Sequence, residues 1–407
     1  MRPDTLKIGQ DLICVAGKND IAVSCLEHLL ELGVDPGRLC VVLNGGDDGR
    51  STWQRSLAFH ARMSGVAART LDDVRKIDRL WFFSVEFDRI LKPADFASDR
   101  LYNVHFSKLP AYRGVATSVW PILRGERETG VTFHRIDSGV DTGPIVHQKV
   151  FPIGQDWTAR DLYFRYLEEG AALFREAISM LKSGTAVETP QTELGASCHR
   201  RRDLDYRSLS IDTTLPADRI LAQIRAYSFW EYQLPVIAGR KIWSAKIGSG
   251  PASGPAGTVR MKGSHRGILC SPDADIELWF SPYEEVYGWA LGDSARVPDL
   301  AEVPDLDLQD AQGWSAMMKA AHSGNSPAIR LLASAGASVA RPNRRGTTPL
   351  MYAFTRMVRV GDATAFKELL ALGADPASRD QHGKSIVDYA PESLAPELRR
   401  NFPDIFT

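Results

Sequence analysis

Hydrophobic residues in the first half of the chain alternate between short apolar runs and stretches with helical periodicity. The apolar run 12–15 leads into an amphipathic stretch, 21–32, that Gly33 closes, which predicts a strand followed by a helix. The order recurs, with strands expected at 39–43, 79–85, 101–105, 130–136 and 145–150 and helices at 52–63 and 158–182. This alternation is typical of a doubly wound α/β domain with a mostly parallel sheet, which we place at residues 1–203.

The pattern changes after the long helix. Residues 183–202 are rich in Gly, Thr and Ser and end in three arginines, so this segment is interpreted as a connection. Residues 220–234 are rich in aromatic side chains, and residues 236–247 alternate apolar and polar around a turn, as a hairpin does. We therefore predict a small β-rich domain at residues 204–300.

The last part of the chain contains an internal repeat. The segments GWSAMMKA, GTTPLMYA and GKSIVDYA begin at Gly313, Gly346 and Gly383, with spacings of 33 and then 37 residues. They resemble ankyrin repeats, with Met at 318 and 351 where that pattern has His, and an insertion within 357–363 explains the longer spacing. About two and a half repeats are expected at residues 301–407. So few repeats bury little surface of their own, so we expect the array to dock on the preceding domains.

Composition excludes several classes of protein. The chain has 407 residues and a net charge of −1, so no global basic field attracts nucleic acid or an anionic membrane. Its five cysteines have no CxxC spacing, so neither a disulfide framework nor a metal site is expected. Without an apolar leader or a run of about 18 apolar residues, we expect a cytoplasmic enzyme with no membrane partner.

Three polar residues stand out within the predicted α/β domain. Asn103 and His105 lie two residues apart on a predicted strand, so their side chains share one face. Asp141 lies on a turn crowded with Asp and Gly residues, in the block GVTFHRIDSGVDTGPIVHQ. Each residue alone is more often structural, but together they form a plausible catalytic set.

These three groups suit acyl transfer to an amine. The amide of Asn103 and the imidazole of His105 can stabilise an oxyanion, an effect worth roughly 3–4 kcal/mol for each well-aimed donor. His105 is the leading candidate for the base that takes the amine proton, and Asp141 can orient that imidazole or shuttle protons. On this reasoning, the general base could be either His105 or Asp141.

The blocks YNVHFSKLPAYRG and GVTFHRIDSGVDTGPIVHQ resemble the folate-dependent formyltransferase family. The resemblance implies a Rossmann-like formyltransferase domain in which Asn103, His105 and Asp141 are catalytic, with N10-formyltetrahydrofolate as co-substrate. It also implies that WFFSVEFDRILKP lies at the pterin. By position, the expected cofactor-binding residues are Phe83, Ser84, Val85, Asp137 and Val140.

Other segments narrow the expected acceptor. AGKND, at 16–20, lacks GxGxxG and the Walker pattern, which disfavours a nicotinamide dehydrogenase. GKNDIAVSCLEHL and LNGGDDGRSTWQRSL resemble the branch that formylates nucleotide-linked amino sugars. The predicted acceptor is a dTDP-linked amino-deoxysugar, most plausibly a 3-amino-3,6-dideoxyhexose for O-antigen or other surface polysaccharide. Its candidate contacts are Arg225, Tyr227, Phe229, Tyr232 and, in the repeats, Trp314.

Alternatives remain open at this point. A methionyl-tRNA formyltransferase would use the same chemistry but needs a basic face for RNA. A catalytically inactive formyltransferase fold could instead serve as an ankyrin scaffold. The repeats could bind a protein, brace the enzyme or hold a second ligand molecule, and a homodimer is expected from the family.

Overall fold

The computed structural model describes residue 6, residues 10–206 and residues 209–406. They form two compact units: residues up to 50, 54–261 and 267–279 in the first, and 51–53, 262–266 and 280 onward in the second. The predicted α/β and β-rich domains thus lie mainly in one unit, and the repeats lie in the other. No described helix is long and apolar enough to cross a membrane.

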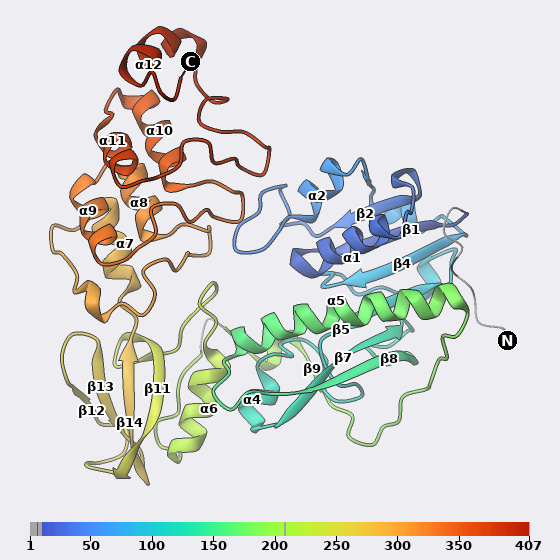
Figure 1. The fold of residues 1–407 in the computed structure, drawn as a ribbon. Helices are drawn as coiled ribbons and strands as arrows, with labels where there is room; N and C mark the ends of the chain where they lie inside the picture. Colours follow the sequence, from blue (N-terminus) through green and yellow to red (C-terminus); the bar gives the residue numbers. More distant parts are fainter. Residues whose placement is uncertain (1–5, 7–9, 207–208, 407) are drawn as a thin grey trace. The chain divides into compact units, whose positions relative to one another are not determined.

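A seven-stranded sheet forms the centre of the first unit (Figure 1). Its order is β3-β2-β1-β4-β5-β7-β8. The strands from β3 to β5 are parallel to one another, whereas β7 is antiparallel to both of its neighbours, β5 and β8. The strands are β1 Leu12–Gly17, β2 Leu39–Leu43, β3 Ala67–Ala68, β4 Leu80–Val85, β5 Leu101–His105, β7 Glu128–Arg135 and β8 Ile145–Pro152. The predicted α/β fold with a mostly parallel sheet is confirmed.

Helices cover this sheet because its strands are apolar on both faces. Helix α1 (Asn19–Glu31) packs on α5 (Ala159–Ser183), where Gly170 allows a close approach to Ile21 and Val104. On the other face, α3 (Leu71–Val74) packs on a cluster that includes Cys14, Phe82 and Leu101. Both faces of the sheet are therefore covered by helices.

Helix boundaries follow capping side chains. Helix α5 begins after Thr158, whose side chain forms a capping box with Asp161, so the predicted start of this helix at residue 158 agrees with the structure. The helix expected from residue 52 instead begins later, as α2 (Leu57–Met63), because the Ser56 hydroxyl accepts the Phe59 N–H and fixes the N-terminus there. Short helices α4 (Trp120–Arg124) and α6 (Ala217–Tyr227) complete the first unit's helices, and α6 packs on α4 and β11.

The predicted β-rich region contains a five-stranded sheet of order β10-β11-β14-β13-β12. Its strands are β10 Val236–Ile237, β11 Arg240–Pro251, β12 Val259–Met261, β13 Arg266–Cys270 and β14 Ala274–Phe280. Strands β10 and β11 form the hairpin that the alternation at 236–247 predicts.

The second unit is mainly helical, and its helices α8 to α11 follow the repeat pattern of the sequence. They are α7 Tyr283–Leu291, α8 Ala316–Ser323, α9 Ser326–Ser334, α10 Pro349–Val360, α11 Thr364–Ala371 and α12 Ala395–Asn401. Helix α10 is longer than α8 and ends at Gly361, so the predicted insertion extends this helix.

One turn recurs before each repeat. In the first copy the Asp310 carboxylate accepts the backbone N–H groups of Gln312 and Trp314, and Gly313 has a left-handed φ of 81°. The same acceptor position is occupied by Asn343 in the second copy and Asp380 in the third. The three copies inferred from sequence therefore share one turn structure.

Candidate active site

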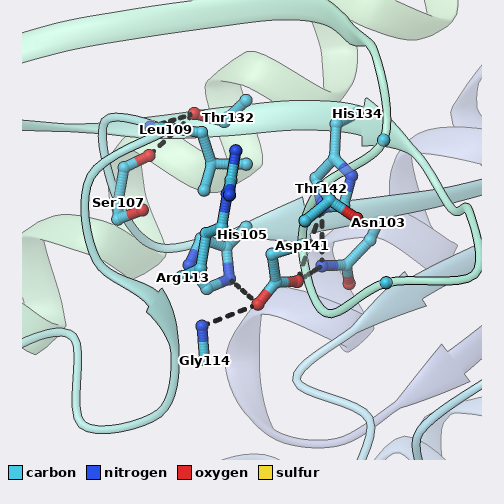
Figure 2. A network of polar contacts seen from close by, with 12 residues as sticks. Asn103, His105, Ser107, Leu109, Arg113, Gly114, Thr132, His134, Asp141 and Thr142 are labelled. Carbon is cyan, nitrogen blue, oxygen red and sulfur yellow. Dashed lines mark hydrogen bonds and ion pairs between the residues drawn. The ribbon is translucent and has the colours of Figure 1, made fainter. Parts of the chain in front are cut away.

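The expected catalytic residues meet where β5 and β7 lie side by side (Figure 2). Strand β5 places Asn103 opposite His134 of β7 and His105 opposite Thr132. The turn between β7 and β8 brings Asp141 onto both strands, so that its carboxylate lies between Asn103 and His105. Residues separated by nearly 40 positions thus form one polar network.

Asp141 is the centre of this network. Its Oδ2 accepts the Gly114 backbone N–H at 2.9 Å and lies 3.5 Å from His105 Nδ1, and its Oδ1 accepts Asn103 Nδ2 at 3.3 Å. Burial by itself raises the pKa of the Asp141 carboxyl, but His105, His134 and the Gly114 N–H outweigh it and hold this pKa well below its usual range. Asp141 is therefore a carboxylate at neutral pH.

The hydrogen bonds assign a position to the proton on each imidazole. His105 Nε2 lies 2.9 Å from the Tyr112 carbonyl, which can only accept, so Nε2 carries a hydrogen and Nδ1 faces Asp141. His134 Nδ1 lies 2.8 Å from the Arg135 carbonyl and is likewise a donor. Its Nε2 is then free to accept from Asn103 Nδ2 at 3.1 Å.

The amide of Asn103 has a fixed orientation for the same reason. Its Nδ2 directs one hydrogen to His134 and one to Asp141, and the flipped amide would place two oxygens against each other. Asn103 Oδ1 therefore remains available as an acceptor. To donate to an oxyanion, Asn103 must exchange one of its two present bonds.

The turn that carries Asp141 is held by a distant segment. Asp141 has a left-handed φ of 54°, which is unfavourable for a residue other than glycine. Gln191 Nε2 donates to the carbonyls of Asp141 at 2.9 Å and Gly143 at 2.7 Å, and the buried Arg113 guanidinium donates to Gln191 Oε1 at 2.9 Å. Gln191 thus clamps the backbone of the turn.

Gly114 is held by the same segment. Strand β6 (Arg113–Gly114) pairs in parallel with β9 (Cys198–His199), and a Cβ on Gly114 would lie 2.0 Å from the His199 carbonyl oxygen. Only glycine fits this approach, and its N–H is then directed at Asp141. The backbone of the Asp141 turn and the Gly114 N–H that bonds the Asp141 carboxylate are therefore both held by residues 191–199.

This geometry can be compared with that of known proteins. A family model described as formyl transferase matches residues 83–178, and one described as ankyrin repeats matches residues 290–380. A crystal structure of an N-formyltransferase from Helicobacter canadensis, in complex with folinic acid and dTDP-3-aminofucose, is 38% identical in sequence. The similarity covers 67% of this chain and 100% of that one, with a TM-score of 0.62. The chain belongs to the formyltransferase family.

Two further relatives bear on the acceptor of this formyltransferase. WlaRD, a sugar 3-N-formyltransferase solved with dTDP and 5-N-formyl-THF, is 38% identical over 66% of this chain and 97% of its own, with a TM-score of 0.62. A methionyl-tRNA formyltransferase of Agathobacter rectalis is 34% identical over 183 residues, which are 44% of this chain. This chain spans only 58% of the length of that tRNA enzyme.

The expected pterin residues lie at the end of β4 and in the Asp141 turn. Phe83 is fully buried, and its ring packs against Phe133 and Phe174, so any contact with a ligand would be through its backbone. Ser84 pairs with Asn103 across the sheet, and Val85 ends the strand. The role of these positions in cofactor binding remains a prediction.

Asp137 and Val140 lie in the same turn and differ in role. The Asp137 carboxylate accepts the Gly139 N–H and the Thr142 hydroxyl, so its side chain stabilises the turn. Val140 is exposed. Beside them is a hollow of about 570 Å³, lined by Lys92, Pro93, Ala94, Arg135, Ile136, Asp137, Ser138 and Pro144.

The candidate sugar contacts differ in accessibility. Arg225 and Tyr227 lie in the last turn of α6, where the Arg225 guanidinium donates to the Gln155 carbonyl. Phe229 is only 6% exposed, with its ring against Tyr163 and Tyr232, which is the environment of a core residue. Tyr232 is 60% exposed and is the aromatic candidate best able to meet a ligand.

Trp314 lies in the second unit, just before α8. Its ring centroid is 4.4 Å from that of Tyr352 and 5.0 Å from that of His322, and Lys319 Nζ lies over the ring at 5.7 Å. This is a small aromatic and cationic cluster of the repeat array.

Sequence reasoning missed several residues of the site. His134 lies within the block quoted for Asp141, and its pairing opposite Asn103 could have been anticipated only from the register of two antiparallel strands. Gly114, Arg113 and Gln191 contribute through contacts between segments far apart in sequence. Among the described residues, no group of His, Cys, Asp and Glu could hold a metal ion.

Proposed function

We propose that this formyltransferase moves the formyl group of N10-formyltetrahydrofolate to the amine of a dTDP-linked amino-deoxysugar, with a 3-amino-3,6-dideoxyhexose as acceptor. The observation that supports this acceptor is the similarity to the Helicobacter canadensis enzyme over its entire length. That protein was crystallised with dTDP-3-aminofucose, which carries an amine, and with folinic acid, which is a formylated folate. The product would serve O-antigen or other surface polysaccharide assembly in the cytoplasm.

The residues of the site fit attack by a neutral amine on the formyl carbon. Asn103 Oδ1 is available to accept an amine hydrogen, which directs the nitrogen lone pair toward the carbon. With Nε2 hydrogen-bonded to Tyr112, His105 uses Nδ1 to take the proton that the amine loses. The positive charge formed on His105 then lies 3.5 Å from Asp141 and is stabilised by that carboxylate.

Two contributions complete the reaction. The negative charge that develops on the formyl oxygen needs a donor, which is an Asn103 N–H once it exchanges its bond to Asp141, or the protonated His105. The proton on His105 is then available for the departing folate nitrogen. Each proton taken from the amine is thus returned to the leaving group, with no net change in the enzyme.

Methionyl-tRNA is a less suitable acceptor. RNA binding depends on neutralising phosphates with a basic face, and this chain has a net charge of −1. The similarity to the tRNA enzyme is also confined to 58% of its length. The polar network that Asn103, His105 and Asp141 form likewise argues against an inactive scaffold, because such a role requires none of it.

For the repeats we propose a binding role that accompanies catalysis, either for a protein or for a second ligand molecule at the Trp314 cluster. The ring of Trp314 has a cation and a second aromatic residue beside it, which suits a planar anionic ligand. We also propose a homodimer, with the edges of the five-stranded sheet as candidate contact surfaces.

One assay tests the proposed function. The full chain is incubated with N10-formyltetrahydrofolate and a panel of dTDP-linked 3-amino and 4-amino sugars or methionyl-tRNA, and release of tetrahydrofolate is followed. We expect turnover with a 3-amino sugar that His105→Asn abolishes. Turnover with methionyl-tRNA alone, or none with any amino sugar, would contradict the proposal.

A further inference from the structure

A second polar cluster lies at the ends of β1 and β4. Strand β1 pairs with β2 on one side and with β4 on the other. The strand order therefore reverses at β1: the strands β2 and β3 are added on one side of it, and β4 and β5 on the other. Loops diverge at such a point, and ligands bind there in open α/β sheets. In this chain the two strand ends carry Lys18, Asn19 and Glu86, and Tyr163 of α5 meets them.

The Glu86 carboxylate is not saturated with hydrogen bonds. It accepts Asn19 Nδ2 at 3.1 Å and the single hydrogen of the Tyr163 hydroxyl, which lies 2.9 and 3.0 Å from its two oxygens. A carboxylate can accept about four hydrogen bonds, so about two acceptor positions remain unused on a half-buried group. Burial also raises the pKa of Glu86, and this effect exceeds the lowering by Lys18, Tyr163 and Asn19.

Two neighbouring groups are also incompletely paired. Gln54 Oε1 accepts the Asp20 N–H at the start of α1, whereas Gln54 Nε2 is buried without a partner among the described residues. Lys18 attracts Glu86 electrostatically, yet it forms no ion pair within the described part of the chain. An acceptor, an amide donor and a cation thus lie near the ends of β1 and β4.

This cluster lies next to the catalytic residues. Ser84 pairs with Asn103 and Val85 pairs with Val104, so β4 ends beside the strand that carries Asn103 and His105. Glu86 follows β4 with a left-handed φ of 53°, and the ring of its partner Tyr163 lies 6.2 Å from that of Phe106, the residue after His105. A hexose whose amine is at Asn103 and His105 can therefore direct a neighbouring ring substituent toward Glu86.

We propose that Glu86, supported by Asn19 and Tyr163, binds a ring hydroxyl adjacent to the amine-bearing carbon of the acceptor sugar. This inference rests on the proposed function and adds to it a specificity-determining residue. The hydroxyl donates to an unused acceptor position of the carboxylate, and an acceptor without that hydroxyl leaves the position empty. Glu86 acts on the acceptor only and takes no part in the proton transfers.

The test compares Glu86→Gln with the unmodified enzyme on three acceptors. These are dTDP-3-amino-3,6-dideoxyglucose and its 2-deoxy and 4-deoxy counterparts, each with saturating N10-formyltetrahydrofolate. The matched control is Glu31→Gln, which makes the same change at the far end of α1, where the side chain is 72% exposed. Folding of each variant is checked by thermal denaturation.

We expect Glu86→Gln to lower kcat/KM for the full acceptor by about tenfold or more, the loss of a hydrogen bond to a charged group. The unmodified enzyme should discriminate against one deoxy acceptor by a similar factor, and the variant should lose this discrimination. The KM for the folate should stay constant, and Glu31→Gln should behave as the unmodified enzyme does.

Three outcomes separate the hypotheses. Equal losses on all three acceptors, as binding of the amine itself by Glu86 would give, overturn the hydroxyl assignment. A changed folate KM with unchanged sugar discrimination overturns it as well. Absence of turnover by the unmodified enzyme with every amino sugar overturns the proposed function, and this inference with it.

Discussion

Replacing Gln191 tests whether the proposed catalytic carboxylate, Asp141, depends on hydrogen bonds from a distant segment. The Gln191→Ala variant removes both hydrogen bonds to the backbone of the Asp141 turn and one of the two acceptors of the Arg113 guanidinium, which keeps Glu193. Each lost bond is worth about 0.5–1.5 kcal/mol, so we expect the free energy of unfolding to fall by about 1–3 kcal/mol. The turn that carries Asp141 can then relax from its unfavourable φ.

The effect on activity should exceed the effect on stability. A displacement of about 1 Å at a catalytic group can cost about a hundredfold in rate, so we expect kcat to fall by about tenfold to a hundredfold. The KM for both substrates should change much less, because Gln191 is proposed to touch neither. The measurement is steady-state formylation of the dTDP-amino sugar, at a temperature well below the denaturation midpoint of the variant.

Two companion variants sharpen this prediction. Gln191→Glu keeps an acceptor for Arg113 but places an anion against two carbonyl oxygens, so it should lower kcat at least as much as Gln191→Ala. Leu194→Ala lies in the same segment at a side chain that is 90% exposed, and it should leave kcat unchanged. A Gln191→Ala enzyme with normal kcat, or one affected only in KM, would refute the clamp.

Four further predictions concern individual side chains. His105→Asn should lower kcat by roughly 10²–10⁴-fold, as expected when a general base is lost, in single-turnover formylation. His134→Gln, which removes the ring nitrogen that accepts Asn103, should lower kcat with little change in KM for either substrate. The pKa of Asp141 is lower in the folded than in the unfolded state, so its contribution to stability is lost as pH falls below about 4, and Asp141→Asn should unfold with a shallower acid dependence. The pKa of Glu86 is raised on folding, so its ionisation costs stability as pH rises above about 4, and Glu86→Gln should raise the melting temperature at pH 7.

The clustering of the proposed catalytic trio could be anticipated from sequence because its determinants are local. Two-residue periodicity puts Asn103 and His105 on one face of a strand, and the Asp and Gly residues around Asp141 specify a turn. Capping residues such as Thr158 similarly specify a helix start without tertiary contacts. Where a competing cap exists, as at Ser56, the local signal placed the helix start several residues too early.

The supporting residues could not be found in this way because their roles depend on pairing between distant segments. The connection expected at 183–202 contains β9 and Gln191, which reach back to the catalytic turn and to Gly114. Its composition is that of an ordinary linker, and nothing local distinguishes Gln191 from other polar residues there. Register and hydrogen-bond geometry supply this information, and only the folded chain has them.

The two half-buried carboxylates near the site, Asp141 and Glu86, differ in how completely their hydrogen-bond acceptor positions are filled. We relate this difference to their proposed roles in catalysis and in substrate recognition. Asp141 receives donors from Gly114 and Asn103 and lies beside an imidazole, so it is stabilised as an anion before any substrate binds. Glu86 retains unused acceptor positions, so its anion is stabilised fully only when a ligand supplies donors. Asp141, whose hydrogen bonds are already formed, suits a reaction that is common to all acceptors. Glu86, whose acceptor positions are partly unused, would make binding depend on which hydroxyl groups the acceptor carries. We therefore expect substitutions at the ends of β1 and β4 to alter which acceptor the enzyme prefers. Asn103 and His105 on β5, and Asp141 in the turn between β7 and β8, should serve the reaction with every acceptor.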